Sequence, residues 1–201
     1  DALHWSWAMA EHLGLHKQIA NRITEPWMTM KTVISGTEWN NFFHLRNHAD
    51  AQPEIKALAE AMTVAYTTHL PVPLKSGEWH LPYITTAIYV PTGELQYFDH
   101  NFNRLSLEDA KVISASCCAQ VSYRKNDDSF DKALKIYKQL IESEPAHASP
   151  VEHQATPIRD GHSVREQWDT GVTHMDRDGQ AWSGNFRGWI QHRQLIPNHS
   201  K

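Results

Sequence analysis

The stretch Glu38–Glu54, which reads EWNNFFHLRNHADAQPE, is the part of the sequence from which the fold is best worked out. Its first half has helical spacing. Trp39, Phe42 and Phe43 fall at positions i, i+3 and i+4, so a helix places all three rings on one face. We therefore expect a short helix with one aromatic face in this half of the stretch.

Arg46 lies where this helix ends and a second helix begins. Asp50 is a favourable N-cap for the second helix, and Pro53 is tolerated in its first turn. Because a helix N-terminus carries positive potential, a guanidinium beside it favours an anionic ligand. A surface ion pair at a helix–corner–helix explains the same residues, and the pattern alone favours that simpler interpretation.

Composition limits the class of protein. The chain has 201 residues, of which 40% are hydrophobic and 21% charged, as in an ordinary enzyme domain. A net charge of −4 gives no sign of a nucleic-acid partner, and no apolar run predicts a membrane span. Cys117 and Cys118 are adjacent and so poorly placed to bridge, which favours a reducing cytoplasm. The first residue, Asp1, is not Met, so we expect a processed protein or a fragment of a longer one.

Apolar periodicity and turn residues predict an α+β fold, helix-rich, with a small and mainly antiparallel sheet. We expect one domain over 1–201, incomplete at its N-terminus, with a mobile loop over 156–181. The predicted helices cover 3–24, 38–46, 51–66, 106–121 and 129–143. The predicted strands cover 27–35, 83–90 and 95–98, and a further strand followed by a helical turn covers 185–193.

Three local signals are specific. Ser106 with Asp109 predicts a capped helix start, and Ser149 before Pro150 predicts another that places His153 near an electropositive helix end. Cys117 lies on the apolar face of its helix, so it is interpreted as core and not as a nucleophile.

Three segments near the N-terminus resemble the flavin-dependent thymidylate synthases, the ThyX family. That family has an Ala-Arg-x-x-x-Pro segment, then a helix ending in F-x-x-L-R, then A-Q-x-E-I. The chain matches these with Asn21–Pro26, Phe42–Arg46 and Ala51–Ile55, in the same order and at similar spacing.

A second group of segments extends the resemblance. CCAQVSY at 117–123 is similar to the family's A-A-R-V-S-Y, with Gln120 where Arg is usual, and HASPVEH at 147–153 is similar to H-x-S-P-x-E-H. The family places both before the first group, so their order here is permuted. That order and the terminal NFRGWIQHR run resemble phage-type members.

Two departures from the family stand out. The R-H-R motif with its serine- and arginine-rich run is absent, and Gln191-His192-Arg193 is only a partial echo of it. We therefore expect a fragment, or a split protein whose companion chain carries that motif. Ser35 and Thr37 stand where the family usually has Asn and Arg, which puts those flavin contacts in doubt.

The resemblance implies reductive methylation of dUMP to dTMP. Methylenetetrahydrofolate supplies the carbon, reduced FAD the hydride, and NADPH reduces the flavin. By this resemblance Arg46 is the catalytic residue, a fixed planar cation against the uracil, and Arg22 binds the dUMP phosphate. Gln52 is a further dUMP ligand.

The resemblance also assigns Asn41, Ser122 and His153 to FAD. It implies a homotetramer whose active sites form between subunits, in the cytoplasm of a bacterium or of a phage-infected host. Neither a metal, a nucleic acid nor a membrane is among the expected partners.

Other classes of function stay open. The chain could be a catalytically inactive nucleotide- or flavin-binding remnant, a subunit of a split enzyme, or a purely structural subunit. Its 14 His residues leave a metal hydrolase as a further class, although no HExxH spacing is present. A bound yellow chromophore, turnover of dUMP and metal analysis distinguish these classes.

Overall fold

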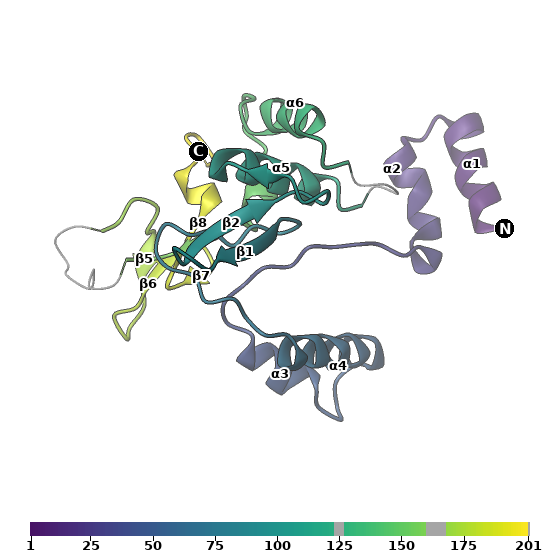
Figure 1. The fold of residues 1–201 in the computed structure, drawn as a ribbon. Helices are drawn as coiled ribbons and strands as arrows, with labels where there is room; N and C mark the ends of the chain where they lie inside the picture. The colour runs from purple at the N-terminus through teal and green to yellow at the C-terminus, as the bar shows by residue number, and fades with distance from the viewer. Residues whose placement is uncertain (123–126, 160–167, 201) are drawn as a thin grey trace. The chain divides into compact units, whose positions relative to one another are not determined.

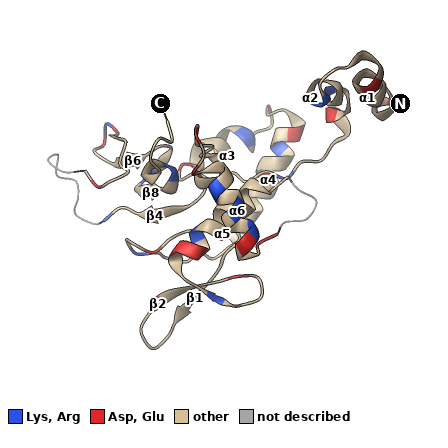
Figure 2. Cartoon of the chain, turned by 90° about the horizontal axis from the view of Figure 1, so that it is seen from above, with Lys and Arg blue, Asp and Glu red and all other residues tan. Residues whose placement is uncertain are grey.

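The computed structural model describes residues 1–122, 127–159 and 168–200, and the chain forms two compact units, Asp1–Thr32 and Val33–Lys201. The described part combines helices with three small antiparallel sheets, so the predicted helix-rich α+β class is confirmed. Figure 1 shows the elements of each unit. Lys and Arg as well as Asp and Glu are distributed over several elements of the ribbon in Figure 2.

The first unit contains α1 (Ala2–Leu13), α2 (Lys17–Ala20) and the 3₁₀ helix η1 (Asn21–Trp27). The predicted single helix over 3–24 is therefore wrong. Gly14 adopts a left-handed conformation (φ 65°) and donates its N–H to Met9 O, which ends α1 at Leu13, eleven residues before the predicted end.

The strand predicted over 27–35 is also wrong. No described residue pairs with this segment as a strand, and η1 includes Pro26 and extends to Trp27. Val and Ile propensity alone does not make a strand without a neighbouring strand to hydrogen-bond. The segment instead carries the chain from the first unit into the second, which begins at Val33.

The second unit begins with a helical hairpin of α3 (Asn40–Arg46) and α4 (Pro53–Thr68), as expected. The three aromatic side chains of the opening stretch cluster as the spacing predicts, and the Phe43 ring also lies 5.6 Å from that of Tyr66 on α4. Asp50 is not the N-cap of α4; that position belongs to Gln52. Asp50 instead lies 3.6 Å from His48 within the corner.

The apolar spacing from Ile55 to Tyr66 predicts a helix face in the core, but this face of α4 is largely exposed. Ala59 is its buried residue, whereas Leu58, Val64 and Tyr66 keep 47%, 62% and 62% of their surface. The seven-residue α3 packs against the sixteen-residue α4 and is too short to cover it.

A three-stranded sheet and two helices form the centre of the second unit. Strands β1 (Thr85–Tyr89), β2 (Glu94–Phe98) and β3 (Arg104–Leu105) pair antiparallel, which confirms the predicted hairpin. α5 (Leu107–Ala119) lies against β2, and α6 (Phe130–Leu140) lies against α5 (Figures 1 and 2).

The predicted capping at the start of α5 is confirmed. Ser106 Oγ accepts a hydrogen bond from Asp109 N at 3.1 Å. Cys117 is 1% exposed and packs with Ile113 of α5 and Ala133 of α6, so its assignment to the core is also confirmed.

The C-terminal part contains short strands and turns. β4 (Ala155–Pro157) pairs with β8 (Trp189–Gln191), and β5 (His174–Met175), β6 (Ala181–Ser183) and β7 (Phe186–Arg187) form the third sheet. The 3₁₀ helix η3 (His192–Leu195) follows β8, in agreement with the strand and helical turn predicted over 185–193. Residues 160–167 of the loop predicted over 156–181 lie outside the described part, and β4 and β5 occupy portions of its flanks.

The helix predicted to start at Ser149 is wrong. Ser149–Val151 forms one 3₁₀ turn, η2, after which β4 begins at Ala155. Pairing of β4 with β8 prevails over the local capping pattern, so His153 follows the C-terminal end of η2 and does not lie near an electropositive helix N-terminus. None of the described helices has the length and apolar character needed to cross a membrane.

A first prediction concerns the α5–α6 core. Ile113→Ala should lower the free energy of unfolding by about 2–5 kcal/mol, because the side chain is buried and its loss leaves a cavity. Ile34→Ala removes the same atoms from a side chain that is 58% exposed and should change it by less than about 0.5 kcal/mol. Urea unfolding of the full chain measures both, and equal losses would contradict this core assignment.

Candidate functional site

Three segments that are far apart in sequence meet in the second unit. Ser35 Oγ lies 3.1 Å from His153 Nδ1, across 118 positions of the chain. Asn185 Nδ2 donates to Ser35 O at 3.5 Å, and Arg187 N donates to Thr37 Oγ1 at 2.9 Å. We call this meeting point the His153 cluster. It comprises Ser35, Thr37, Glu152, His153, Asn185, Arg187, Gln191 and Arg193.

Antiparallel pairing of β4 with β8 holds the last two segments together. Ala155 is opposite Gln191, and His192 N donates to Gln154 O at 2.9 Å beyond the last strand residue. Because β4 begins two residues after His153, this pairing also fixes where the imidazole leaves the backbone.

The buried side-chain amide of Gln191 completes the junction. Its Nε2 donates to Glu152 O at 2.9 Å and to Asn185 Oδ1 at 3.0 Å, so both of its donors are used. Gly184 makes room for it, since a Cβ there would stand 2.5 Å from Gln191 Oε1.

Two arginines tie the edges of the cluster to carboxylates. Arg193 Nη1 forms an ion pair with Glu152 Oε1. The Arg187 guanidinium lies 3.3 Å from Asp176, 3.8 Å from Glu38 and 4.0 Å from Asp178. Both guanidinium groups are thus engaged within the protein and serve to position the segments.

His153 is the group in the cluster best suited to bind a ligand. It is half-buried, and burial lowers the pKa of its imidazole below the ordinary value, which favours the neutral ring near pH 7. A neutral imidazole has one donor and one acceptor nitrogen. The Ser35 hydroxyl occupies Nδ1, and no hydrogen bond from the described residues occupies Nε2.

The other residues expected to bind ligands do not join this cluster. Arg46 is the exposed last residue of α3, Gln52 is the exposed N-cap of α4, and Asn41 is exposed on α3. Ser122 is exposed in the turn after α5. Arg22 is exposed on η1 of the first unit.

The structure also shows the contacts of Ser35 and Thr37, the two residues that differ from the usual Asn and Arg of the ThyX pattern. Ser35 and Thr37 both direct their hydroxyl groups to neighbours inside the cluster, one to His153 and one to Arg187 N. Sequence reasoning missed the positioning roles of Asn185 and Gln191. The terminal NFRGWIQHR run contains both, but nothing local in that run indicates which distant segment they contact.

His192 follows Gln191 of the cluster, and in the sequence it was only part of a partial match to the R-H-R motif. It is 7% exposed, and its ring stands edge-on to that of Trp79 with centroids 5.4 Å apart. Burial lowers its pKa to about 4, with a further contribution from Lys111 that Glu108 opposes. Its Nδ1 has no hydrogen-bond partner among the described residues.

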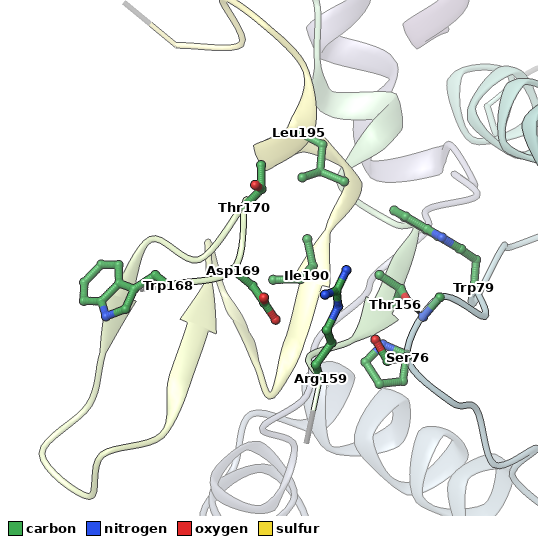
Figure 3. A pocket seen from close by; sticks show the side chains of 11 residues that line it. Ser76, Trp79, Thr156, Arg159, Trp168, Asp169, Thr170, Ile190 and Leu195 are labelled. Atoms are coloured by element: carbon green, nitrogen blue, oxygen red, sulfur yellow. Dashed lines mark hydrogen bonds between the residues drawn. The ribbon is translucent and has the colours of Figure 1, made fainter. Parts of the chain in front are cut away.

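A surface cavity of about 540 Å³ lies on the other side of β8 (Figure 3). Side chains alternate along a strand, so Ile190 faces this cavity while Gln191 faces the cluster. In Figure 3, the Arg159 guanidinium and the Asp169 carboxylate point into the cavity near Ile190, whereas the Trp168 indole points away from it.

The described residues limit two other kinds of chemistry. Within them, no group of three or more His, Cys, Asp or Glu side chains is placed to hold a metal ion. Burial raises the pKa of Cys118 to about 12, which keeps its sulfur protonated near pH 7. Comparison of the chain with protein-family models, curated proteins and solved structures gave no match.

A second prediction concerns His192. Its folded-state pKa of about 4 lies below the ordinary 6.5, so the unfolded chain binds more protons between these values. The stabilisation that this group gives is complete above pH 6.5 and is lost as the pH falls toward 4, by up to about 3 kcal/mol.

Urea unfolding of wild type and His192→Gln at several pH values measures this dependence. The variant should have the flatter profile between pH 6.5 and 4, while His69→Gln, at an exposed position, should follow wild type. Parallel profiles for wild type and His192→Gln would show that His192 does not titrate as a buried neutral group.

Proposed function

We propose that the chain is a flavin-dependent thymidylate synthase of the ThyX type, or the larger part of one, that converts dUMP to dTMP. One observation carries the proposal. The resemblance singles out segments in three distant parts of the chain, and Ser35, His153 and Asn185 bring them into hydrogen-bond contact. A chance set of short matches gives no reason for such a meeting.

The His153 cluster fits part of what a flavin needs. The isoalloxazine ring presents both donors and acceptors along its polar edge, and a neutral imidazole whose Nε2 has no partner among the described residues can pair with either kind. Ser35 fixes the orientation of that ring, and Asn41 and Ser122 are exposed and available as further FAD contacts. FAD, when bound, would supply the hydride; NADPH would reduce it and methylenetetrahydrofolate would give the carbon.

The corner between α3 and α4 fits the nucleotide. Arg46 is exposed, and its guanidinium forms no hydrogen bond or ion pair with the described residues. Gln52 lies at the other end of the same corner, which Asn47 secures by donating to Thr63 Oγ1 at 2.6 Å. Arg46 would hold the uracil ring and stabilise charge that develops on it, while Arg22 would bind the phosphate.

The proposed dUMP and FAD ligands lie on separate elements, and the resemblance implies that the complete site forms between subunits. A homotetramer or a companion chain with the R-H-R segment would supply the remainder, in the cytoplasm of a bacterial or phage-infected cell. An inactive flavin-binding remnant is the second candidate. It is favoured by Ser35 and Thr37, whose hydroxyl groups are already used inside the protein.

A third prediction concerns the flavin. FAD should bind the assembled oligomer, and His153→Gln should weaken that binding on the order of 10-fold, because one hydrogen bond to the ring is lost. Flavin absorbance across size-exclusion fractions and fluorescence titration measure assembly and affinity. His69→Gln is the control at an exposed position. FAD eluting with a monomer, or unchanged affinity in His153→Gln, would count against this flavin site.

A fourth prediction separates catalysis from structure at Arg46. Arg46→Lys keeps the charge but loses the planar set of donors, so dTMP formation should fall on the order of 10²-fold or more. The exposed Arg177 gives the control, since Arg177→Lys should leave the rate within a few-fold of wild type.

The assay uses the full assembly with dUMP, methylenetetrahydrofolate, FAD and NADPH, and flavin content and thermal stability are checked alongside. Wild-type turnover with loss in Arg46→Lys fits the enzyme. Flavin binding without turnover fits the remnant. Activity of Arg46→Lys close to wild type would return Arg46 to the role of a helix-end cation, which contributes about 0.3–1 kcal/mol.

A further inference from the structure

The cavity behind β8 contains one positive and one negative side chain that do not satisfy each other. Arg159 and Asp169 both line it and point into it (Figure 3), yet neither side chain forms a hydrogen bond or ion pair with any described residue. Charged side chains at a cavity wall that lack a partner among the described residues are groups that a ligand can pair.

The backbone near each of the two charged residues is held by a hydrogen bond. Ile158, next to Arg159, donates its N–H to Gly188 O at 3.0 Å. On the other wall, Gly171 O accepts from Ser183 Oγ at 2.6 Å. Hydrogen bonds therefore hold the backbone near both charged residues.

The wall between the two charges is apolar and tightly packed. Ile190, Leu195 and Trp79 line it, and a Cβ on Gly171 would stand 2.7 Å from Ile190 and 2.9 Å from Leu195. Hydroxyl groups of Ser76, Thr156 and Thr170 border the polar side. A volume of about 540 Å³ lies within the range of small-molecule sites.

We infer that this cavity binds a small α-amino acid, or a compound that ends in the same ammonium and carboxylate groups. The carboxylate pairs with Arg159, which can donate two hydrogen bonds in one plane, and the ammonium pairs with Asp169. The apolar side chain rests on Ile190 and Leu195. A phosphate dianion fits less well, because Asp169 would repel it in the same space.

This site is independent of the proposed dTMP synthesis. It lies on the Ile190 face of β8, and none of the residues assigned to dUMP or FAD lines it. An amino acid bound there could be present in a protein of any of the classes considered above, so failure of either assignment leaves the other intact.

Calorimetric titration of the full chain with four probes tests the inference. Leucine carries both charges, N-acetyl-leucine lacks the ammonium, leucinamide lacks the carboxylate, and dUMP represents the phosphate ligand. Leucine should bind best, and each truncated probe should bind on the order of 10- to 100-fold more weakly, as expected for one lost charged hydrogen-bond partner.

Two variants and two matched controls test whether leucine binds in this cavity. Arg159→Gln and Asp169→Asn should each weaken leucine binding to a similar degree, while Arg177→Gln and Asp131→Asn, at exposed positions outside the cavity, should not. Thermal unfolding of all four variants confirms that they fold.

Three outcomes would overturn the inference. The first is absence of leucine binding up to about 10 mM, weaker than any useful site. The second is binding of dUMP that depends on Arg159 and not on Asp169, which would make this an anion site. The third is loss of thermal stability in Arg159→Gln and Asp169→Asn without loss of binding, which would make the two residues an ion pair of the fold.

Discussion

The two hydrogen bonds donated by the Gln191 amide are the interaction on which the C-terminal part of the second unit depends. They join Glu152 O, which ends the η2 turn, to Asn185, which reaches Ser35. Water is excluded there, since Gln191 is 3% exposed, so an unmade bond would leave a buried polar group unsatisfied. Glycine at position 184 is required by the same amide, because any side chain would enter its space.

A second buried side-chain amide, that of Gln154, uses only one of its two polar atoms in hydrogen bonds with the described residues. Gln154 donates through Nε2 to Ser114 Oγ and Pro150 O, each at 3.1 Å, and so links α5 to the start of β4. Its Oε1 and His192 Nδ1 have no partner among the described residues. Buried polar atoms without hydrogen-bond partners are unfavourable, and both of these lie next to the paired strands β4 and β8.

The sequence predicted elements whose causes are local and missed those whose causes are distant. The aromatic face of α3, the Ser106 cap and the β1–β2 hairpin follow from residues within a few positions of each other. The residue pattern around Gly14 does not show that its backbone turns left-handed and ends α1. Ser35 and His153 are 118 positions apart in sequence. Their contact depends on chain topology, which the spacing of residues within a short segment does not predict.

The alternation of side chains along β8 gives the two candidate sites a common support. Ile190 faces the Arg159–Asp169 cavity and Gln191 faces the His153 cluster, so a slip of one position would exchange them and destroy both. Gln191 N donates to Ser183 Oγ and His192 N to Gln154 O, which fixes the register from two sides. Moving β8 in response to a ligand would break these bonds together with those of the amide. Hydrogen bonds therefore hold the strand in one register between the two candidate sites.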